Sequence, residues 1–270
     1  MTRLAFEKMH GAGNDFIVLD GRDVAVGGIA PDRIAAWCAR GRGIGADGLI
    51  VTEPEGSDRV RMHYFNADGG EADMCGNGAR CTVAYAHARG LMGRTGILAT
   101  RRGDLAATVH GPGDVEVELP PYRDAELDLT LEGSPYRRHH HCDTGVPHLV
   151  IPVDDVDVVP VVEHGRPLRM HARFQPAGVN VNWVAVDPRA EEWRLRTYER
   201  GVEAETLACG TGASAAAVTL VLGGLATSPV AIRTRGGDRL IVTVDLETGR
   251  LRLRGPAVVA YTGEVESDGG

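Results

Sequence analysis

Two short stretches of the chain place a cysteine directly before a glycine-rich turn. The first is ADMCGNGARC, residues 72–81, and the second is TLACGTGASA, residues 206–215. An apolar run follows each of them, which predicts a helix beginning just after Cys75 and another just after Cys209. The N-terminus of a helix carries about half a positive charge and can lower the pKa of a thiol from about 8.5 toward neutrality. Both cysteines are therefore candidates for acid–base chemistry.

The glycines of the two stretches point to a particular reaction. They let a ligand approach the backbone, and the free amides of a helix N-terminus bind carboxylates and oxyanions. If two such loops face one another, a small carboxylate between them has a thiol on each side of its α-carbon. One thiolate can then remove the α-proton and the opposite thiol can return a proton to the other face. Amides aimed at the developing charge contribute about 3–4 kcal/mol each.

An internal duplication makes this pairing more than a coincidence. The numbering offset that relates Cys75 to Cys209 recurs in several separate blocks, and we call it the duplication offset. The matched pairs include Gly11 with Gly145, Ile17 with Ile151, Tyr64 with Tyr198, Gly90 with Gly224, and Thr100 with Thr234. At the same offset Asn14 aligns with His148 and Asn66 with Arg200, positions at which the two copies have diverged. Cys38, Cys81 and Cys142 have no counterparts and are interpreted as packing residues.

Each copy has the same coarse pattern of elements. Three short strands precede the cysteine loop, one apolar helix follows at about 77–89 or 211–222, and a hairpin comes last. The first copy also has a predicted helix at about 31–40. The pattern predicts an α/β (α+β) fold of two homologous, mostly antiparallel domains, 1–118 joined by 259–270, and 119–258. A pseudo-twofold arrangement predicts that the active site lies in the cleft between them.

The composition excludes several classes of function. The chain is 43% hydrophobic and 24% charged, and its formal net charge of −8 disfavours a nucleic-acid partner. No apolar run is long enough to span a membrane, and the N-terminus has no apolar signal core. Five cysteines form no disulfide framework, which favours reduced thiols and a cytoplasmic location.

Neither a cofactor nor a metal is expected. The sequence contains a single lysine, Lys8, so chemistry with pyridoxal phosphate, which needs a lysine in the pocket, is disfavoured. The run RRHHHC, residues 137–142, could suggest a metal site, but adjacent residues of a strand alternate between its two faces. The three histidines therefore cannot converge on one ion.

Taken together, the motifs resemble those of the diaminopimelate epimerase family of cofactor-independent amino-acid racemases. The resemblance rests on MHGAGNDF (9–16), GIGADG (43–48), FNADGGEADMCGNGARC (65–81), NVN (180–182) and YERGVEAETLACGTGASAAA (198–217), in the family's order along nearly the whole chain. It implies two domains, each with a barrel-like sheet around a central helix, and a homodimer. It also implies interconversion of LL- and meso-diaminopimelate on the route to lysine and peptidoglycan.

The resemblance assigns roles to individual residues. Cys75 and Cys209 would be the two bases, and His148 and Glu199 would influence their ionisation. Arg200 is the natural partner for the distal carboxylate of the substrate, because a guanidinium binds a carboxylate through two hydrogen bonds. The substrate-binding set implied by the family is Asn14, Asn66, Gly76, Asn77, Asn180, Glu199, Arg200, Gly210 and Thr211.

Two departures from the family pattern keep other functions open. The family often shows asparagine where this chain has Val146, and some members carry glutamine where Gly48 lies. A related racemase of another amino acid, such as histidine, is therefore an alternative substrate assignment. A non-catalytic amino-acid-binding protein and an isomerase that shares the fold are two further alternatives, although the paired cysteines argue against the last.

Overall fold

The computed structural model describes residues 2–267 and divides the chain into two compact units. Unit 1 comprises Met1–Val117 and Gly255–Gly270, and unit 2 comprises Glu118–Arg254. The sequence predicts that the chain crosses between the units after residues 118 and 258. In the structure it crosses slightly earlier, after residues 117 and 254. Each unit is described by itself below.

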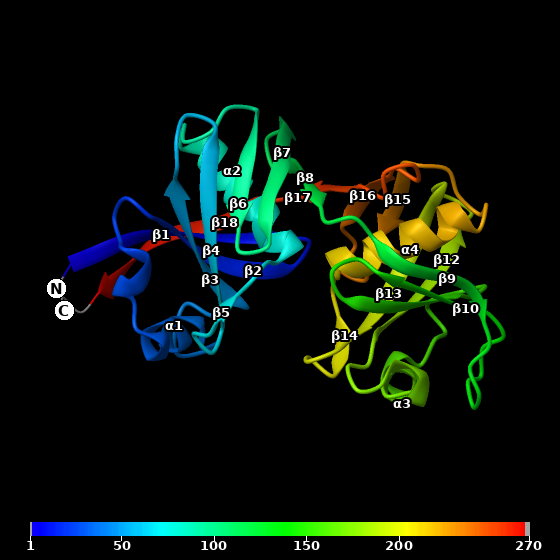
Figure 1. Cartoon of the computed structure of the whole chain (residues 1–270). Coiled ribbons are helices and arrows are strands. Elements are labelled where there is room, and N and C mark those ends of the chain that lie inside the picture. The colour runs from blue at the N-terminus through cyan, green and yellow to red at the C-terminus, as the bar shows by residue number, and fades with distance from the viewer. Residues whose placement is uncertain (1, 268–270) are drawn as a thin grey trace. The chain divides into compact units, whose positions relative to one another are not determined.

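Unit 1 is built on a mixed sheet that wraps one central helix (Figure 1). Its strands follow the spatial order β18-β1-β2-β3-β4-β6-β7-β8, and short β5 pairs with the end of β4. Only β2–β3 and β4–β6 are parallel among these pairs. The bounds are β1 Thr2–Gly11, β2 Asn14–Asp20, β3 Gly48–Pro54, β4 Arg59–Asn66, β5 Glu71–Ala72, β6 Thr95–Thr100, β7 Gly103–Gly111, β8 Asp114–Leu119 and β18 Val258–Ser267.

Unit 2 repeats this topology. Its strands follow the order β9-β10-β11-β12-β13-β15-β16-β17, with short β14 on β13 and with β11–β12 and β13–β15 parallel. The bounds are β9 Arg123–Leu129, β10 His139–Asp143, β11 Pro147–Pro152, β12 Asn180–Asp187, β13 Glu192–Glu199, β14 Ala204–Thr206, β15 Val230–Arg233, β16 Arg239–Val244 and β17 Leu251–Pro256.

One edge strand of each unit comes, in the sequence, directly after the final strand of the other unit. Thus β9, which follows β8, pairs with β10 in unit 2, and β18, which follows β17, pairs with β1 in unit 1. Figure 1 shows β18, in red, beside β1, in blue. Each half of the sequence therefore ends with a strand that belongs to the sheet of the other unit.

The register of the first parallel pair preserves the duplication offset. Phe16 of β2 is paired with Gly48 of β3, and their counterparts Val150 and Asn182 are paired in β11 and β12. The following hairpin departs from this rule. Ile50 is paired with Tyr64, whereas Val184, the counterpart of Ile50, is paired with Leu195 and not with Tyr198. The sequence match of the two tyrosines therefore does not place them at equivalent positions of the sheets.

The two central helices match the duplication residue for residue. Helix α2 spans Gly76–Ala88 and α4 spans Gly210–Leu222, and each packs against several strands of its own unit. Both end before a glycine with a left-handed backbone, Gly90 at φ +67° and Gly224 at φ +69°, as the sequence predicts. Nearly all of α4 is buried, which agrees with its Ala- and Val-rich composition.

A second helix is present in both units, not only in the first. Helix α1 (Pro31–Cys38) confirms the helix expected near 31–40, but α3 (Val161–Arg169) was not expected. Its interior contains Gly165 and Pro167, which ordinarily interrupt helices. Packing explains the glycine, because a Cβ at Gly165 would lie 2.6 Å from the Tyr198 side chain.

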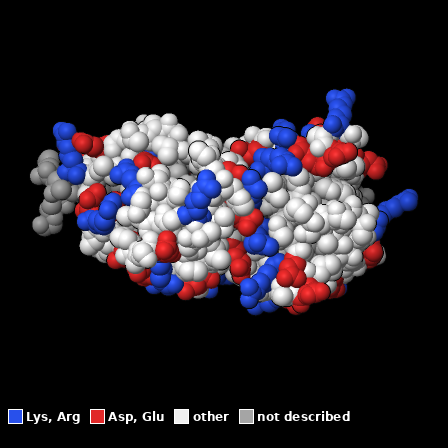
Figure 2. Space-filling view, turned by 90° about the horizontal axis from the view of Figure 1, so that it is seen from above, with Lys and Arg blue, Asp and Glu red and all other residues white. Residues whose placement is uncertain are grey.

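The surface carries both signs of charge. Basic and acidic side chains are interspersed on the face drawn in Figure 2, and neither sign forms a continuous field there. Within the described residues, none of the helices is both long enough and apolar enough to cross a membrane.

Candidate active site

The sheet register of unit 1 gathers several predicted site residues at one edge. Asn14 begins β2, and Gly48, at the start of parallel β3, is paired with Asn66 at the end of antiparallel β4. The chain then forms β5 and reaches Cys75, the residue that caps helix α2. Asn66 is exposed, whereas Asn14 and Cys75 are half-buried.

Cys75 lies at the N-cap of α2 with an extended backbone, φ −138° and ψ 122°. Its Sγ donates to Oδ1 of Asn14 at 3.5 Å. Behind it, Gly76 and Asn77 form the first turn of the helix, and a Cβ on Gly11 of β1 would lie 2.9 Å from the Asn77 carbonyl oxygen. Glycine at position 11 therefore allows β1 to approach the backbone of the cysteine loop.

A fully buried arginine supports this loop, and the sequence analysis missed it. Arg80 is 0% exposed and donates to Oδ1 of Asn77 at 2.9 Å and to the carbonyl oxygens of Gly76 and Pro256 at 3.4 and 3.3 Å. The corresponding residue of unit 2 is Ser214, which donates to the Gly210 carbonyl at 2.9 Å. An arginine among the small and apolar residues in the middle of the helix was the available signal.

The register of unit 2 gathers the second group of predicted residues. His148 of β11 is paired with Asn180 of β12, and Val181 is paired with Tyr198, so Glu199 and Arg200 reach the same edge. The Oδ1 atom of Asn180 accepts from the Arg200 backbone N–H at 2.8 Å. The Arg200 guanidinium donates to the Ala177 carbonyl at 3.1 Å.

Cys209 lies at the N-cap of α4 with nearly the same backbone as Cys75, φ −131° and ψ 108°. Its hydrogen bonds differ. The Cys209 Sγ accepts from the Gly212 N–H at 3.4 Å and lies 3.5 Å from the hydroxyl of Thr211. The carbonyl of Thr211 accepts from Thr144 Oγ1 at 2.8 Å, which anchors the loop to the turn after β10.

A buried asparagine joins His148 to this loop. The Asn182 amide donates to His148 Nδ1 and to the Leu149 carbonyl, both at 3.1 Å, and its Oδ1 accepts from Thr197 Oγ1 at 2.9 Å. A Cβ on Gly212 would lie 2.4 Å from the same Oδ1, so the amide packs directly against α4. The sequence analysis did not single out Asn182.

Burial lowers the pKa of His148 to about 3, because its imidazole is fully enclosed. The side chain is therefore neutral at physiological pH. Since Nδ1 accepts a hydrogen bond from the Asn182 amide, the ring proton lies on Nε2. The histidine predicted to influence thiol ionisation is thus neutral and of fixed tautomer, and its buried Nε2 has no hydrogen-bond partner among the described residues.

The two departures from the family pattern have local structural settings. A Cβ at Gly48 would lie 2.4 Å from the Phe65 carbonyl oxygen and 2.7 Å from the ring of Tyr64. The position therefore accepts no side chain in this backbone. Val146 lies in the turn between β10 and β11, where its carbonyl accepts from the Thr144 N–H at 3.2 Å.

The remaining cysteines are enclosed in the protein. Burial raises the pKa of Cys38 to about 11 and that of Cys81 and of Cys142 to about 12. These thiols stay protonated near neutral pH and are poor nucleophiles.

The histidines of β10 each have a separate partner. His139 contacts Ser134 Oγ at 2.7 Å, His140 Nδ1 accepts from the Asp128 N–H at 3.1 Å, and His141 bonds the Asp124 carbonyl at 2.9 Å. Lys8, the single lysine, is buried in β1 and donates to Asp15 and to the Gly45 carbonyl. Its amine is therefore engaged in an ion pair.

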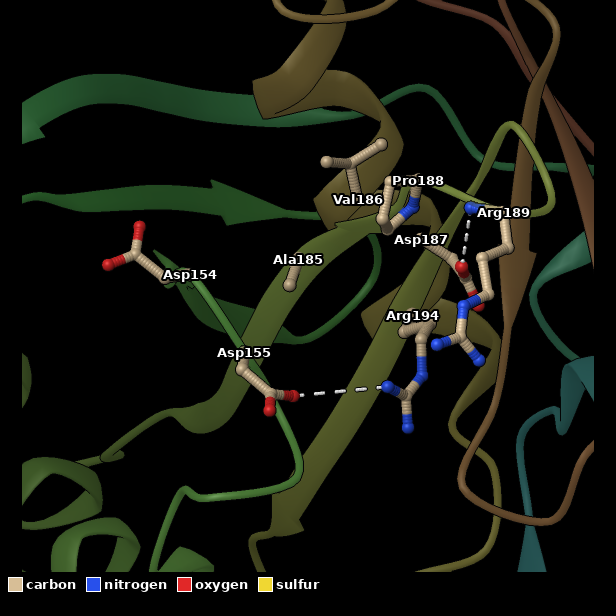
Figure 3. Close-up of a pocket in the computed structure, with 8 residues that line it drawn as sticks. All are labelled: Asp154, Asp155, Ala185, Val186, Asp187, Pro188, Arg189 and Arg194. Atoms are coloured by element: carbon tan, nitrogen blue, oxygen red, sulfur yellow. Dashed lines mark hydrogen bonds and ion pairs between the residues drawn. The ribbon is translucent and has the colours of Figure 1, made fainter.

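A surface hollow of unit 2 lies at the opposite end of β12 from Asn180. It contains a mixture of acidic and basic side chains, and there Nη1 of Arg194 lies 3.9 Å from Oδ1 of Asp155 (Figure 3). Its lining consists of Asp154, Asp155, Ala185, Val186, Asp187, Pro188, Arg189 and Arg194. None of the predicted site residues is among them.

Comparison with solved structures identifies the fold class. A PhzF-family phenazine biosynthesis protein from Bacillus anthracis superposes with a TM-score of 0.72 at 15% identity, covering 99% of this chain and 100% of that chain. A hydroxyproline epimerase from Agrobacterium vitis superposes with a TM-score of 0.70 at 17% identity, covering 98% and 91%. The chain thus shares the overall fold of these two proteins.

Sequence comparison is more specific. The profile of the family described as diaminopimelate epimerase matches residues 6–123 and 141–265. A diaminopimelate epimerase of Aquifex aeolicus is 40% identical over 98% of this chain and 99% of its own length, and one of Gemmatimonas aurantiaca is 42% identical over 97% and 99%. The chain belongs to the diaminopimelate epimerase family, and the protein is an isomerase.

Proposed function

We propose that the protein interconverts LL- and meso-2,6-diaminopimelate by a two-base reaction of Cys75 and Cys209, without a cofactor. The observation that carries the proposal is the equivalence of the two thiols. They occupy matching positions of the duplication, and each lies at the N-cap of a central helix with an extended backbone, φ −138° and ψ 122° at Cys75 and φ −131° and ψ 108° at Cys209. The family assignment supplies the substrate class.

In the proposed step one cysteine acts as the base and the other as the acid. One thiolate takes the α-proton, the C–H electron pair moves into the carboxylate, and a dianionic enediolate-like species forms. The other thiol gives its proton to the opposite face of the α-carbon and becomes a thiolate. Backbone N–H groups of Gly76–Asn77 and Gly210–Thr211 are proposed to hold the carboxylate, where donors are worth about 3–4 kcal/mol each.

The distal end of the substrate is assigned to the polar residues around Arg200. Its guanidinium would bind the distal carboxylate through two hydrogen bonds, with Asn14, Asn66, Asn180 and Glu199 completing the pocket. His148 and Glu199 are proposed to influence the ionisation of the thiols. For His148 this role is supported by its neutral, fixed tautomer.

A second substrate remains a candidate because of Gly48 and Val146. The backbone around Gly48 leaves no room for the glutamine that some relatives carry, and Val146 lacks the amide that would contact the distal end. A racemase of another amino acid, such as histidine, would fit a distal site with fewer polar groups.

Deuterium exchange separates these functions. The reduced protein is incubated in D2O with LL-diaminopimelate and then with a panel of L-amino acids, and α-deuterium is followed by NMR. We expect uptake with meso product from diaminopimelate, and a loss of at least about 10³-fold in Cys75→Ala and in Cys209→Ala. Uptake from a different amino acid alone would move the assignment to that substrate. No uptake from any compound would favour the amino-acid-binding protein.

A cellular setting is proposed together with the function, and the family assignment supports it. We place the reaction in the cytoplasm, in lysine and peptidoglycan precursor biosynthesis, and expect a homodimer. Sedimentation velocity of the purified protein tests the last point.

A further inference from the structure

The thiol of Cys75 contacts an oxygen that can only accept a hydrogen bond. The partner is Oδ1 of Asn14, 3.5 Å from the sulfur, and the same oxygen accepts from the Asn77 amide at 3.5 Å. A carbonyl oxygen beside a thiol stabilises the protonated form, because a thiolate has no proton to donate.

The orientation of the Asn14 amide is not arbitrary. Its Nδ2 donates to the carboxylate oxygen Oδ2 of Asp47. An ionised carboxylate only accepts hydrogen bonds, so a flipped amide would bring two oxygens together. The Asp47 carboxylate therefore decides which end of Asn14 faces the sulfur.

Asp47 is itself held in place by the surrounding backbone and by one cation. Its Oδ2 accepts from the Asp15 N–H at 3.1 Å, its own N–H donates to the Asp15 carbonyl at 2.8 Å, and Arg40 donates to its Oδ1 at 2.8 Å. The carboxylate thus has a defined position between β2 and the start of β3.

The charged groups near Cys75 act in both directions. Lys8 and Arg40 are paired with Asp15 and Asp47, so this cluster has no net charge. On α2, the buried Arg80 lies beside Asn77 and favours the thiolate, as does the helix N-terminus. The Asn14 carbonyl opposes both influences.

Unit 2 has a different arrangement around its thiol. By the duplication offset, Asp47 corresponds to Val181, which is fully buried, and Asn14 corresponds to His148. Cys209 accepts a hydrogen bond from the backbone N–H of Gly212. The carboxylate that orients the partner of the thiol therefore has no counterpart at the matching position of the second copy.

We propose that Asp47 is a positioning residue for the reaction proposed above: it fixes the amide of Asn14 so that Cys75 is held as a hydrogen-bond donor. The inference rests on the proposed function for its role in turnover. It makes Cys75 the thiol that is kept ready to give a proton to the α-carbon. Asp47 touches no reacting atom and acts only through Asn14.

The test follows the alkylation of each cysteine by iodoacetamide as a function of pH, by mass spectrometry of the Cys75 and Cys209 peptides. In Asp47→Asn the amide of Asn14 is free to turn its Nδ2 toward the sulfur. We expect the midpoint of the Cys75 profile to fall by about one pH unit, which is about tenfold faster alkylation below the midpoint. The Cys209 profile should not move.

A double-mutant cycle separates orientation from charge. In an Asn14→Ala background, Asp47→Asn should shift the Cys75 midpoint by less than about 0.3 unit. An equal shift in both backgrounds would show that Asp47 acts as a bare charge, and an unchanged or higher midpoint in the single variant would equally overturn the proposal. Asp47→Ala repeats the test if the asparagine variant does not fold.

Two controls complete the design. Asp104→Asn removes an exposed carboxylate of unit 1, the partner of Arg59 at 2.6 Å, and should leave both profiles unchanged. Alkylation needs no substrate, so the expected shifts in a protein without epimerase activity would reject only the proposed function. Epimerase activity with an unmoved Cys75 midpoint would reject only the role of Asp47.

Discussion

The two cysteine loops have nearly the same backbone conformation, but different side chains surround them. Each thiol caps a central helix, yet Cys75 is supported by a buried arginine and faces a carbonyl, whereas Cys209 is supported by a serine and accepts an N–H. The duplication therefore preserved the element that presents the sulfur and changed the groups that tune it. The reaction proposed above uses one thiol as acid and the other as base, and a difference in surroundings favours such a division.

We expect the largest change in the free energy of unfolding from exchanging Gly48 and Asn182, equivalent residues of the two units that differ greatly in size. Gly48 and Asn182 occupy equivalent register positions, but a Cβ at Gly48 meets the Phe65 carbonyl at 2.4 Å. We expect Gly48→Asn to lower the free energy of unfolding by about 3 kcal/mol or more. Asn182→Gly should lower it by about 2–3 kcal/mol, because it leaves buried partners unsatisfied. Urea denaturation followed by circular dichroism measures both.

Gly27→Asn is the matched control for this exchange, since no atom lies within 4 Å of a Cβ at Gly27. It should change the free energy of unfolding by less than about 0.5 kcal/mol. If Gly48→Asn changed the free energy of unfolding equally little, Gly48 would not be packed as closely against Phe65 as the structure shows.

Arg80 and Ser214, which support the two cysteine loops, should also contribute differently to the free energy of unfolding. Arg80→Met removes the donor to Asn77 and to two carbonyls in a fully buried site, and we expect a loss of about 2–3 kcal/mol in unfolding free energy. Ser214→Ala removes one hydrogen bond and should lose about 1 kcal/mol. Equal losses in urea denaturation would contradict the view that the loops are supported differently.

Acid should destabilise unit 2 at a higher pH than unit 1. Burial holds the pKa of His148 at about 3 and also lowers the pKa of His139 and His140, all in unit 2. Between pH 6.5 and 3 the unfolded histidine binds a proton that the folded one does not, so stability falls as the pH falls through this range. We expect unit 2 to lose about 2 kcal/mol at pH 5 relative to pH 7.5 from His148 alone.

Two carboxylates of unit 1 should respond at a lower pH than the histidines of unit 2. Burial tends to raise the pKa of Asp15 and Asp20, but hydrogen bonds from Arg40 and Lys8 to Asp15, and from Arg22 to Asp20, hold both below their usual value. Stability from these carboxylates is complete above pH 3.8 and is lost as the pH falls further. Tryptophan fluorescence measures each unit separately, with Trp37→Phe reporting unit 2 and a Trp183→Phe/Trp193→Phe variant reporting unit 1. A common midpoint would show that the units unfold as one.

Local patterns were sufficient to predict the duplicated elements. The apolar runs and terminal glycines located α2 and α4 almost to the residue at both ends, and the single offset predicted two homologous units. Helix α3 was missed because Gly165 and Pro167 argue against a helix, and the packing of Gly165 on Tyr198 is a contact between segments well separated in the sequence.

The groups around the thiols could not be predicted for a similar reason. Asn182 and Asp47 act through partners that only the sheet register brings close, such as His148 for Asn182 and Asn14 for Asp47. The shifted register of the β12–β13 hairpin relative to β3–β4 is likewise invisible to an alignment of the copies. Sequence patterns specify elements, and register specifies which side chains meet.

The smallest effect concerns the hydroxyl beside Cys209. Thr211 Oγ1 lies 3.5 Å from the sulfur, and its counterpart in unit 1 is Asn77. A hydroxyl that donates to the sulfur stabilises the thiolate, so Thr211→Val should raise the midpoint of the Cys209 alkylation profile by a few tenths of a pH unit. Thr211→Ser keeps the hydroxyl and should leave the midpoint in place. A fall in the Thr211→Val midpoint would mean that the sulfur donates to Thr211, as Cys75 does to Asn14, and the two thiols would then differ less than their hydrogen bonds indicate.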